Sequence, residues 1–560
     1  MLERSTSPGT VAVTWREGLF MACIAAVYLA AMLHLAANTG ITVDEPSHIV
    51  SSILYWEGND TLYPGDMPPL IKIAGGALAA SADFRIVEES APAWAKRHEW
   101  TIGLDMIRRM TERQIRESMF RARLGLMIFP LATMLLIWWW GRELLSPAAG
   151  VAIAALFAME PTALGHSVLF KNDHAATFGY LLFWYRAWRF WQRPSLANLS
   201  WMAAAGTLGM LAKLSMLLLV LIAPCLAMIR LRGMRMVYGL VVAAAIPYAL
   251  SALACQFDLR PLTPEELAGE ATRGHLPWFV LRAVSVFQWL PIPIRLWQGF
   301  SSLLFNNGHE NAVYFMGARH SWGHPAYFAV AALVKCPEPL LLAIAGGAVV
   351  LLRDALRRVL RVSDLLWIGP GLLYFALASY SGLQLGFRLI LPCLPFALLI
   401  AGHLLRTLPA WGSPVLLCTM LAVVAPQHPH VLSYFNAASG GPKNATKYLS
   451  DSNVDWGQNL RELRRYMQRE KILGISLSYF GSDNVFAYFR PGQVDWISPP
   501  YGGTKPATAK FEPGPGIYAI SATLLTGQFA DPPYRDYYAA FRAKQPIAYA
   551  GQSIFIYRFP

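Results

Sequence analysis

The sequence has few charged residues for its length. Only 14% of its 560 residues are Asp, Glu, Lys or Arg, whereas 55% are hydrophobic and the mean hydropathy is +0.37. A soluble protein of this size needs more charge on its surface. The composition therefore excludes an ordinary soluble enzyme and predicts a mainly α, polytopic membrane protein.

Cysteine is also scarce, and internal repeats and low-complexity tracts are missing. The six cysteines all fall in or beside apolar runs, so the polar segments offer neither a disulfide framework nor a cysteine metal site. Repeated halves are typical of many transporters, and their absence counts against that class. The remaining interpretation is a membrane protein whose function depends on its polar loops.

About eleven apolar runs predict membrane spans, because each approaches the roughly 20 residues that cross a bilayer. They cover about residues 20–35, 122–140, 147–165, 173–190, 197–212, 214–229, 236–256, 325–352, 364–381, 387–405 and 411–427. The first run lacks a small-residue cleavage motif, so we interpret it as a retained span and not as a signal peptide.

The net charge of +13 is partly explained by three arginine-rich connections, at residues 186–193, 230–235 and 353–361. Membrane proteins keep such connections on the cytoplasmic side. Alternation of the spans then predicts a cytoplasmic N-terminus, with the first polar loop and everything after about residue 428 on the other side. The positive charge thus indicates orientation, and no nucleic-acid partner is predicted.

The chain divides into a membrane domain, residues 1–427, and an extracytoplasmic α/β domain, residues 428–560. Two large outer loops interrupt the membrane domain, at 39–120 and 257–324; the first is expected to hold interfacial helices, including one from 46 to 56. In the C-terminal domain we expect a helix over 457–469, capped by the preceding DSNVD. The remaining expected elements are strands in ILGISLSYF, GIYAISA, PIAYAG and SIFIYRF, and a helix in YRDYYAAFRAKQ.

Two adjacent carboxylates, Asp44 and Glu45, follow the first span in the stretch DEPSH, with His48 one helical turn further on. A carboxylate at a partly dry surface can take the proton of an attacking hydroxyl. We predict Asp44 as the base and Glu45 as its orienter or as a metal ligand. A competing interpretation is that Asp44 simply caps the helix that begins at Pro46.

A second acid and four cations are candidates for the same site. Asp173 begins the fourth span in KNDHAATF, where capping of the helix is the alternative. An interior guanidinium or ammonium suits a lipid phosphate, whereas pairing with an acid or a snorkelling lysine is the structural alternative. These donor-phosphate candidates are Arg388, Lys72, Lys335 and Lys213.

Two polar segments are expected to contact substrate. The stretch DSNVDWGQ, after the last span, combines hydrogen-bonding and stacking side chains of the kind that bind a sugar or a peptide. Its candidate residues are Asp451, Asn453, Asp455, Trp456 and Gln458. In the second outer loop, GHENAVYFMG adds His309 and Tyr314 as residues that line an outer cavity.

Together these motifs resemble the GT-C glycosyltransferases, in particular family 39, which includes protein O-mannosyltransferases and lipid A aminoarabinose transferases. The resemblance lies in the order DEPSH, PPL, KNDHAATF, AKLS, YFMG, VKCPEP, GFRLILPCLPF and DSNVDWGQ, and it extends to about residue 460. The chain departs from many relatives in having no asparagine before the paired prolines and no tyrosine after Arg388.

The resemblance implies transfer of a sugar from a polyprenyl-phosphate donor to a protein, lipid or glycan acceptor outside the cytoplasm, in a bacterial inner membrane. It implies Asp44 as the residue that activates the acceptor, Asp173 as the second acid and Arg388 as the phosphate-binding cation. No cofactor is required by the motifs, although a divalent metal ion is a candidate. The alternatives are a lipid-linked oligosaccharide transferase or ligase, and a transporter or flippase.

Overall fold

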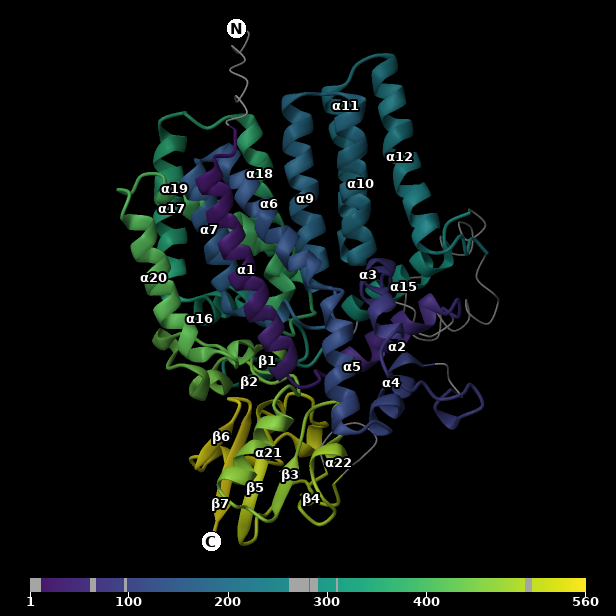
Figure 1. Ribbon diagram of the computed structural model, residues 1–560, viewed down its shortest axis with the longest axis vertical. Helices are drawn as coiled ribbons and strands as arrows, with labels where there is room; N and C mark the ends of the chain where they lie inside the picture. Colours follow the sequence, from purple (N-terminus) through teal and green to yellow (C-terminus); the bar gives the residue numbers. More distant parts are fainter. Residues whose placement is uncertain are drawn as a thin grey trace.

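A computed structural model describes residues 12–60, 67–94, 98–260, 282, 291–308, 311–498 and 506–560. The chain is mainly helical, as the composition predicts. Helix α1 (Trp15–Asn38) begins toward one end of the longest axis, and the C-terminal sheet lies at the opposite end (Figure 1).

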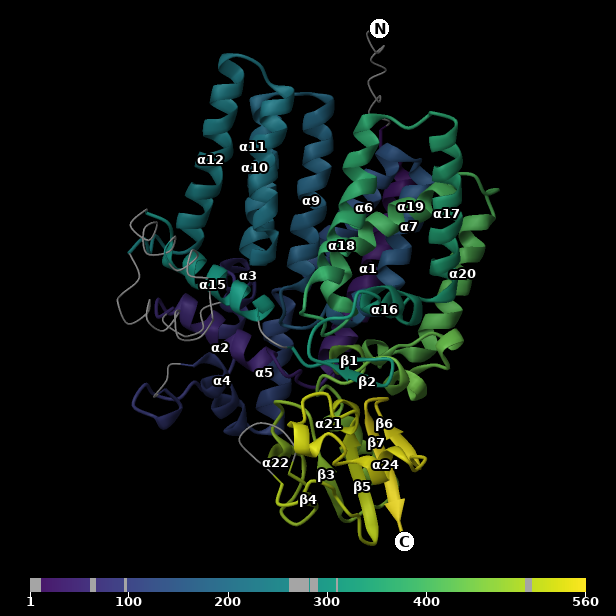
Figure 2. The ribbon, with the colours of Figure 1, turned by 180° about the vertical axis from the view of Figure 1, so that it is seen from behind.

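The long helices form two groups that stand side by side in both views (Figures 1 and 2). One group consists of α9 (Asp173–Gln192), α10 (Leu196–Ala212), α11 (Leu217–Arg230) and α12 (Met234–Ala254). The other consists of α1 (Trp15–Asn38), α6 (Ile128–Leu144), α7 (Pro147–Met159), α17 (Glu338–Leu356), α18 (Leu365–Tyr380), α19 (Leu394–Leu405) and α20 (Gly412–Val424).

Each of the eleven predicted apolar runs coincides with one of these helices. Six helical segments in the described part of the chain are long and apolar enough to cross a membrane by length and composition. They are Trp15–Asn38, Glu112–Leu144, Met234–Ala254, Glu338–Leu356, Val362–Tyr380 and Phe387–Leu405. The protein therefore has the helices of a multi-pass membrane protein, whereas the count of eleven spans stays a prediction.

Two of the predicted spans are divided into two helices at a proline. The run 147–165 divides into α7 and α8 (Pro161–His166), and the run 325–352 divides into α16 (Tyr327–Lys335) and α17. Pro161 and Pro337 stand at these breaks, where a residue without an N–H cannot continue the preceding helix. Both breaks lie at the helix ends that face the C-terminal sheet (Figure 1).

Shorter helices lie between the α9–α12 group and the end that carries the sheet (Figures 1 and 2). They are α2 (Glu45–Trp56), α3 (Pro69–Ala80), α4 (Glu99–Arg108), α5 (Glu112–Leu124) and α15 (Ile294–Gly308). The predicted helix over 46–56 is thus confirmed as α2. The arginine-rich connections 186–193, 230–235 and 353–361 lie at the other end of the helices, where α1 begins (Figure 1).

The C-terminal part contains a five-stranded sheet with strand order β4-β3-β5-β7-β6. Strand β3 pairs in parallel with β4 and β5, whereas β7 is antiparallel to β5 and β6. The strands are β3 (Ile475–Ser478), β4 (Val494–Trp496), β5 (Gly516–Ser521), β6 (Ala548–Ala550) and β7 (Ile554–Phe559); the helices are α21 (Leu460–Arg469), α22 (Val485–Tyr488), α23 (Ala522–Leu525) and α24 (Ala539–Arg542). All four predicted strands are present, and the domain boundary at 427 stays a prediction.

Three details of this part differ from the sequence expectation. Helix α21 begins at Leu460, and its N-cap Asn459 makes no side-chain capping bond, so DSNVD does not cap it. Instead Asp451–Asn453 forms its own short 3-10 helix, η9. The helix expected in 534–545 is only the single turn α24. Strand β4 carried no sequence signal long enough to predict it, and outside this part the same holds for the hairpin of β1 (Val313–Phe315) with β2 (Ala318–His320).

Candidate active site

Asp44 lies in the turn between α1 and α2 and carries a carboxylate that does not cap the helix. It occupies the N-cap position of α2, yet its side chain makes no capping bond. Its Oδ2 lies 2.5 Å from Nζ of Lys171, and the same ammonium lies 2.8 Å from Nε2 of His48. The side chain of Asp44 is 27% exposed, so this carboxylate is paired but still reachable.

The turn that carries Asp44 is held by the C-terminal part of the chain. The backbone N–H of Gly40 donates to the carbonyl of Gln458, and that of Val43 donates to the carbonyl of Trp456, both at 2.9 Å. Ser482 Oγ also donates to the Val43 carbonyl at 2.7 Å. A Cβ at Gly40 would meet the Gln458 carbonyl at 2.6 Å, so this close approach requires glycine. The segment DSNVDWGQ thus acts as a support for the α1–α2 turn.

Glu45 points away from Asp44 into a buried ion pair. Its two oxygens accept from Arg123 Nε at 2.8 Å and Nη2 at 2.7 Å, and both side chains are 0% exposed. The same carboxylate accepts from the backbone N–H groups of Thr42 and Phe170, each at 2.9 Å. Arg123 also donates to the Gly40 carbonyl at 2.7 Å. Both oxygens of Glu45 already accept hydrogen bonds, so Glu45 fits a positioning role and has little remaining capacity to bind a metal ion.

Asp173 receives two cations from other parts of the chain. One carboxylate oxygen lies 3.5 Å from Arg388 Nη1, and the other lies 3.5 Å from Lys213 Nζ. Neither Asn172 nor Asp173 makes a side-chain cap on α9, so the capping alternative does not apply. Both distances are long for ion pairs, which leaves the cations able to approach another anion.

Arg388 lies on the short helix η4 (Phe387–Cys393), and its guanidinium is fixed by two contacts. Its Nε donates to Ser452 Oγ at 3.0 Å, and its Cζ lies 4.3 Å from the ring centre of Trp456. Gly386 before η4 has a φ of 155°, and a Cβ there would collide with Ser452 Oγ. Lys171 Nζ lies 5.5 Å from the same Trp456 ring. One indole therefore supports the two cations nearest to Asp44 and Asp173.

The charges of this cluster set the protonation of its acids. Burial would raise the pKa of Asp44, but the charges of Lys171 and Arg388 outweigh it and hold the pKa below its usual 3.8. Burial and the charge of Lys171 lower the pKa of His48 to about 3, so His48 is neutral and accepts from Lys171. Burial raises the pKa of Asp451 to about 7, and the negative charge of Asp44 contributes to that rise.

We call the group formed by Asp44, His48, Lys171, Asp173, Lys213, Arg388, Asp451 and Trp456 the charged cluster. Its members come from the α1–α2 turn and the first turn of α2, the α8–α9 connection and the start of α9, the end of α10, η4, and the start of the C-terminal part. The predicted residues Asp44, His48, Asp173, Arg388, Lys213, Asp451 and Trp456 are thus brought together, and their catalytic roles stay predictions.

Two predicted cations lie elsewhere. Lys72 is 2% exposed and pairs with Asp60 at 2.6 Å, beside Arg295, so it neither snorkels nor joins the charged cluster. Lys335 donates to two backbone carbonyls, those of Leu432 at 2.9 Å and Asn453 at 2.6 Å. Both lysines therefore stabilise chain segments near the site instead of meeting an anion within it.

Several residues predicted to bind substrate are used internally. Asn453 accepts from the backbone N–H of Phe387 and donates to the Tyr327 hydroxyl, so it orients η4. Asp455 is 0% exposed and accepts from backbone groups of Gly457 and Thr523. Burial raises the pKa of Asp455 to about 7.

Gln458 accepts from the N–H of Trp456 and donates to Ser433 Oγ, and the Tyr314 hydroxyl donates to the Thr446 carbonyl. The contacts of both residues thus lie within the protein. His309 lies outside the described residues.

The sequence interpretation gave Lys171, Arg123 and Ser452 no role, although each holds a residue that it singled out. Lys171 stands two residues before Asp173, so a search for a cation facing Asp44 could have found it. Arg123 lies 78 positions from Glu45 and Ser452 lies 64 from Arg388, separations that carry no local signal.

An apolar cavity of about 430 Å³ leads to the charged cluster. It lies between α9, η2 (Leu214–Met216) and α11 on one side and α18, α16 and η4 on the other. Tyr180, Trp184 and Tyr374 form part of its wall, and Lys213 lines it as well. Because Lys213 also pairs with Asp173, the cavity and the charged cluster share one residue. Among the described residues, no group of three or more His, Cys, Asp and Glu side chains is placed to hold a metal ion.

Comparisons with known proteins give one family match and several structural similarities. Across 96% of this chain and 97% of the other, it is similar to ArnT from Cupriavidus metallidurans in the apo state, with 14% identity and a TM-score of 0.46. ArnT bound to undecaprenyl phosphate gives 12% identity, the same coverage and a TM-score of 0.42. The apo oligosaccharyltransferase of Archaeoglobus fulgidus gives 12% identity and a TM-score of 0.44 over 86% of this chain and 65% of that one.

No curated protein matches this chain. The family match covers about a quarter of the chain and includes α9 to α12, and with them Lys171, Asp173 and Lys213. Over residues 107–253 the chain matches the sequence model of the dolichyl-phosphate-mannose-protein mannosyltransferase family, which confirms the resemblance for that segment.

Proposed function

We propose that this chain is a membrane glycosyltransferase that moves a sugar from a polyprenyl-phosphate donor to an acceptor hydroxyl. The observation that carries the proposal is the apolar cavity, because Lys213 forms part of its wall. Lys213 pairs with Asp173, and Asp173 also pairs with Arg388, whose charge acts on Asp44. The family match supports it, because the matched family is described as using a polyprenyl-phosphate sugar, dolichyl-phosphate-mannose.

The donor is an amphipathic molecule, and the site offers both environments that it needs. A polyprenyl chain buries apolar surface against the aromatic and leucine side chains of the cavity. Its phosphate then comes within reach of Lys213 and Arg388, whose present contacts with Asp173 are only 3.5 Å. A guanidinium can bind two phosphate oxygens at once, which makes Arg388 the main phosphate residue.

In the reaction that we propose, Asp44 accepts the proton of the acceptor hydroxyl as its oxygen bonds to the anomeric carbon. The bond from that carbon to the phosphate oxygen breaks, and its electron pair leaves with the polyprenyl phosphate. Arg388 and Lys213 stabilise the charge that develops there. Because a phosphate is a good leaving group, the step needs no strong general acid.

Lys171 links the two halves of this proposal. In the structure its ammonium keeps the Asp44 carboxylate deprotonated and ready to accept a proton. A donor phosphate would compete with Asp44 for Lys171, and loosening that pair increases the basicity of Asp44. Donor binding thereby prepares the base before the acceptor reacts.

Orientation and acceptor belong to the same proposal. The arginine-rich connections favour a site on the extracytoplasmic face of a bacterial inner membrane, together with the C-terminal sheet. The acceptor supplies a hydroxyl of a protein, lipid or glycan.

The test is to incubate the purified full-length protein with a panel of polyprenyl-phosphate sugars and measure which one is consumed. Asp44→Asn serves as the inactive variant. Asp105→Asn is the matched control, because Asp105 is an acid on α4 that pairs with Arg109. Consumption of one donor by wild type and the control, but not by Asp44→Asn, supports the proposal. Movement of lipid across vesicles with no donor consumed would instead show a flippase.

A further inference from the structure

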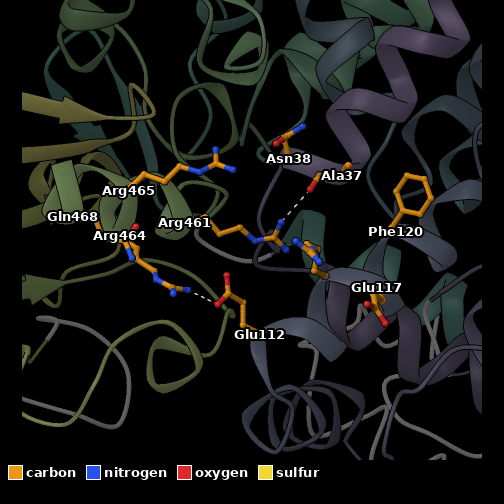
Figure 3. A pocket seen from close by; sticks show the side chains of 10 residues that line it. Ala37, Asn38, Glu112, Glu117, Phe120, Arg461, Arg464, Arg465 and Gln468 are labelled. Carbon is orange, nitrogen blue, oxygen red and sulfur yellow. Dashed lines mark hydrogen bonds and ion pairs between the residues drawn. The ribbon is translucent and has the colours of Figure 1, made fainter.

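A second pocket lies between the membrane helices and the C-terminal part, and its lining shares no residue with the charged cluster. It measures about 560 Å³ and is lined by four arginines, Arg116, Arg461, Arg464 and Arg465, with Glu112 and Glu117. Figure 3 shows that the arginines of α21 approach it from one side and that Glu112, Glu117 and Phe120 of α5 lie on the other. We call it the arginine pocket.

The acids of the arginine pocket are already paired, so its positive charge is not cancelled. Glu112 forms an ion pair with Arg464, and Glu117 pairs with Arg113, which does not line the pocket, at 2.9 Å. Arg465 is paired with Glu462 of its own helix at 2.5 Å. The other two arginines of the lining are Arg116 and Arg461.

Within the described part of the chain, neither Arg116 nor Arg461 has a carboxylate at ion-pair distance. Arg461 is 8% exposed and donates to the Ala37 carbonyl at 3.1 Å and to the Tyr488 hydroxyl at 3.3 Å, and Tyr488 in turn donates to Asp483. Arg116 is exposed at the rim. A buried, oriented guanidinium beside a free one is an arrangement that favours a doubly charged oxyanion.

Part of the lining of the arginine pocket belongs to helical segments that can cross a membrane. Ala37 and Asn38 end α1, and Phe120 lies on α5, which a turn at 125–127 joins to α6; α1 and the combined segment Glu112–Leu144 can each cross a membrane by length and composition. Both also expose large apolar side chains further along, with Val27 at 71% and Ile128 at 61%. The pocket therefore lies where two lipid-facing helices meet the water-exposed part.

We infer that the arginine pocket binds the phosphomonoester headgroup of an anionic membrane lipid. The phosphate contacts Arg116 and Arg461, with Arg465 at the edge, and the lipid chains lie along α1 and α6. A free phosphate ion shares the charge but gains nothing from the adjoining apolar helices, so the lipid is the favoured source. This site is separate from the proposed transfer reaction and does not rest on it.

The test measures lipid binding to the purified full-length protein in detergent, by native mass spectrometry. The pocket variant is Arg116→Gln with Arg465→Gln. The control is Arg121→Gln with Arg469→Gln, which removes the same two charges from α5 and α21 but changes neither the pocket lining nor the partners of its acids. Dioleoylphosphatidic acid is the probe, dioleoylphosphatidylcholine the neutral lipid, and inorganic phosphate the competitor.

We expect the pocket variant to bind phosphatidic acid about tenfold more weakly than wild type, and the control to change by less than about twofold. Equal weakening in both variants would overturn the inference, because general surface charge would then explain binding. Equally tight binding of phosphatidylcholine would also overturn it. Inorganic phosphate that competes at the same concentration as the lipid would show an ion site instead of a lipid site.

Discussion

The regions around Asp44 and Glu45 are neighbours in the chain but are built in different ways. Glu45 lies in a closed region, where Arg123 and two backbone N–H groups occupy its oxygens and no surface is exposed. Asp44 lies in an open region, the charged cluster, where contacts to Asp173 are long and a cavity adjoins. A satisfied buried pair holds a fold together, whereas an unsatisfied one leaves charge available for a substrate.

Loss of the Asp44 carboxylate should lower the transfer rate more than any other single change in the charged cluster. Asp44→Asn keeps the shape of the side chain but removes the base, so we expect the transfer rate to fall by about 10²–10⁴-fold. The thermal inactivation temperature should stay close to that of wild type, because the side chain is part exposed. Donor consumption and melting in detergent measure both, and near wild-type transfer would contradict the comparison.

Removing the charge of Glu45 from the closed region should lower the stability of the fold and leave the transfer rate less affected. Glu45→Gln leaves the Arg123 guanidinium buried without its counter-charge, which costs about 3–5 kcal/mol in such pairs. We expect a clear drop in melting temperature and, below it, a transfer rate per folded molecule within several-fold of wild type. If Glu45→Gln melts normally and is inactive, the role given to Glu45 is wrong.

Within the open region, Arg388→Lys should weaken binding of the donor. Lysine keeps the charge but loses the two-oxygen contact and the stacking on Trp456, so the donor KM should rise about tenfold while kcat changes less. Arg406→Lys is the matched control, because Arg406 pairs with Asp354 far from the cluster. Steady-state kinetics with varied donor separates KM from kcat, and an unchanged KM would remove Arg388 from the phosphate site.

The smallest expected effect is a shift in pH dependence. In wild type the pKa of Asp44 lies below 3.8, so transfer should not lose its base between pH 5 and 8. Lys171→Met removes the leading positive charge, and burial then raises the pKa of Asp44, so the variant should lose activity at a higher pH as the medium is acidified. A pH profile of kcat/KM measures this, with Lys443→Met as the exposed control.

The sequence predicted the helical architecture because long apolar runs are a strong local signal. It missed the breaks at Pro161 and Pro337 because hydrophobicity continues through both prolines. The four predicted strands are present because their aromatic and β-branched residues are typical of a sheet. Strand β4 has only three residues and depends on its pairing with β3, so no local pattern revealed it.

For the candidate site, charges at the ends of apolar runs led to Asp44, Asp173 and Arg388, which the structure brings into one cluster. The different situations of Asp44 and Glu45 could not be predicted. Glu45 depends on Arg123, which a separate helix presents, and Asp44 depends on Lys171, which follows the break at Pro161. Long-range pairing of this kind leaves no trace in the spacing of one sequence.

The central claim, that Asp44 supplies the base, is tested most directly by chemical rescue. Asp44→Ala removes the carboxylate and leaves space for a small one, so donor consumption is measured with and without added formate. We predict that transfer is lost in Asp44→Ala and is partly restored as the formate concentration rises, whereas formamide, the neutral analogue of the same size, restores nothing. Wild-type transfer by Asp44→Ala without formate would contradict the account.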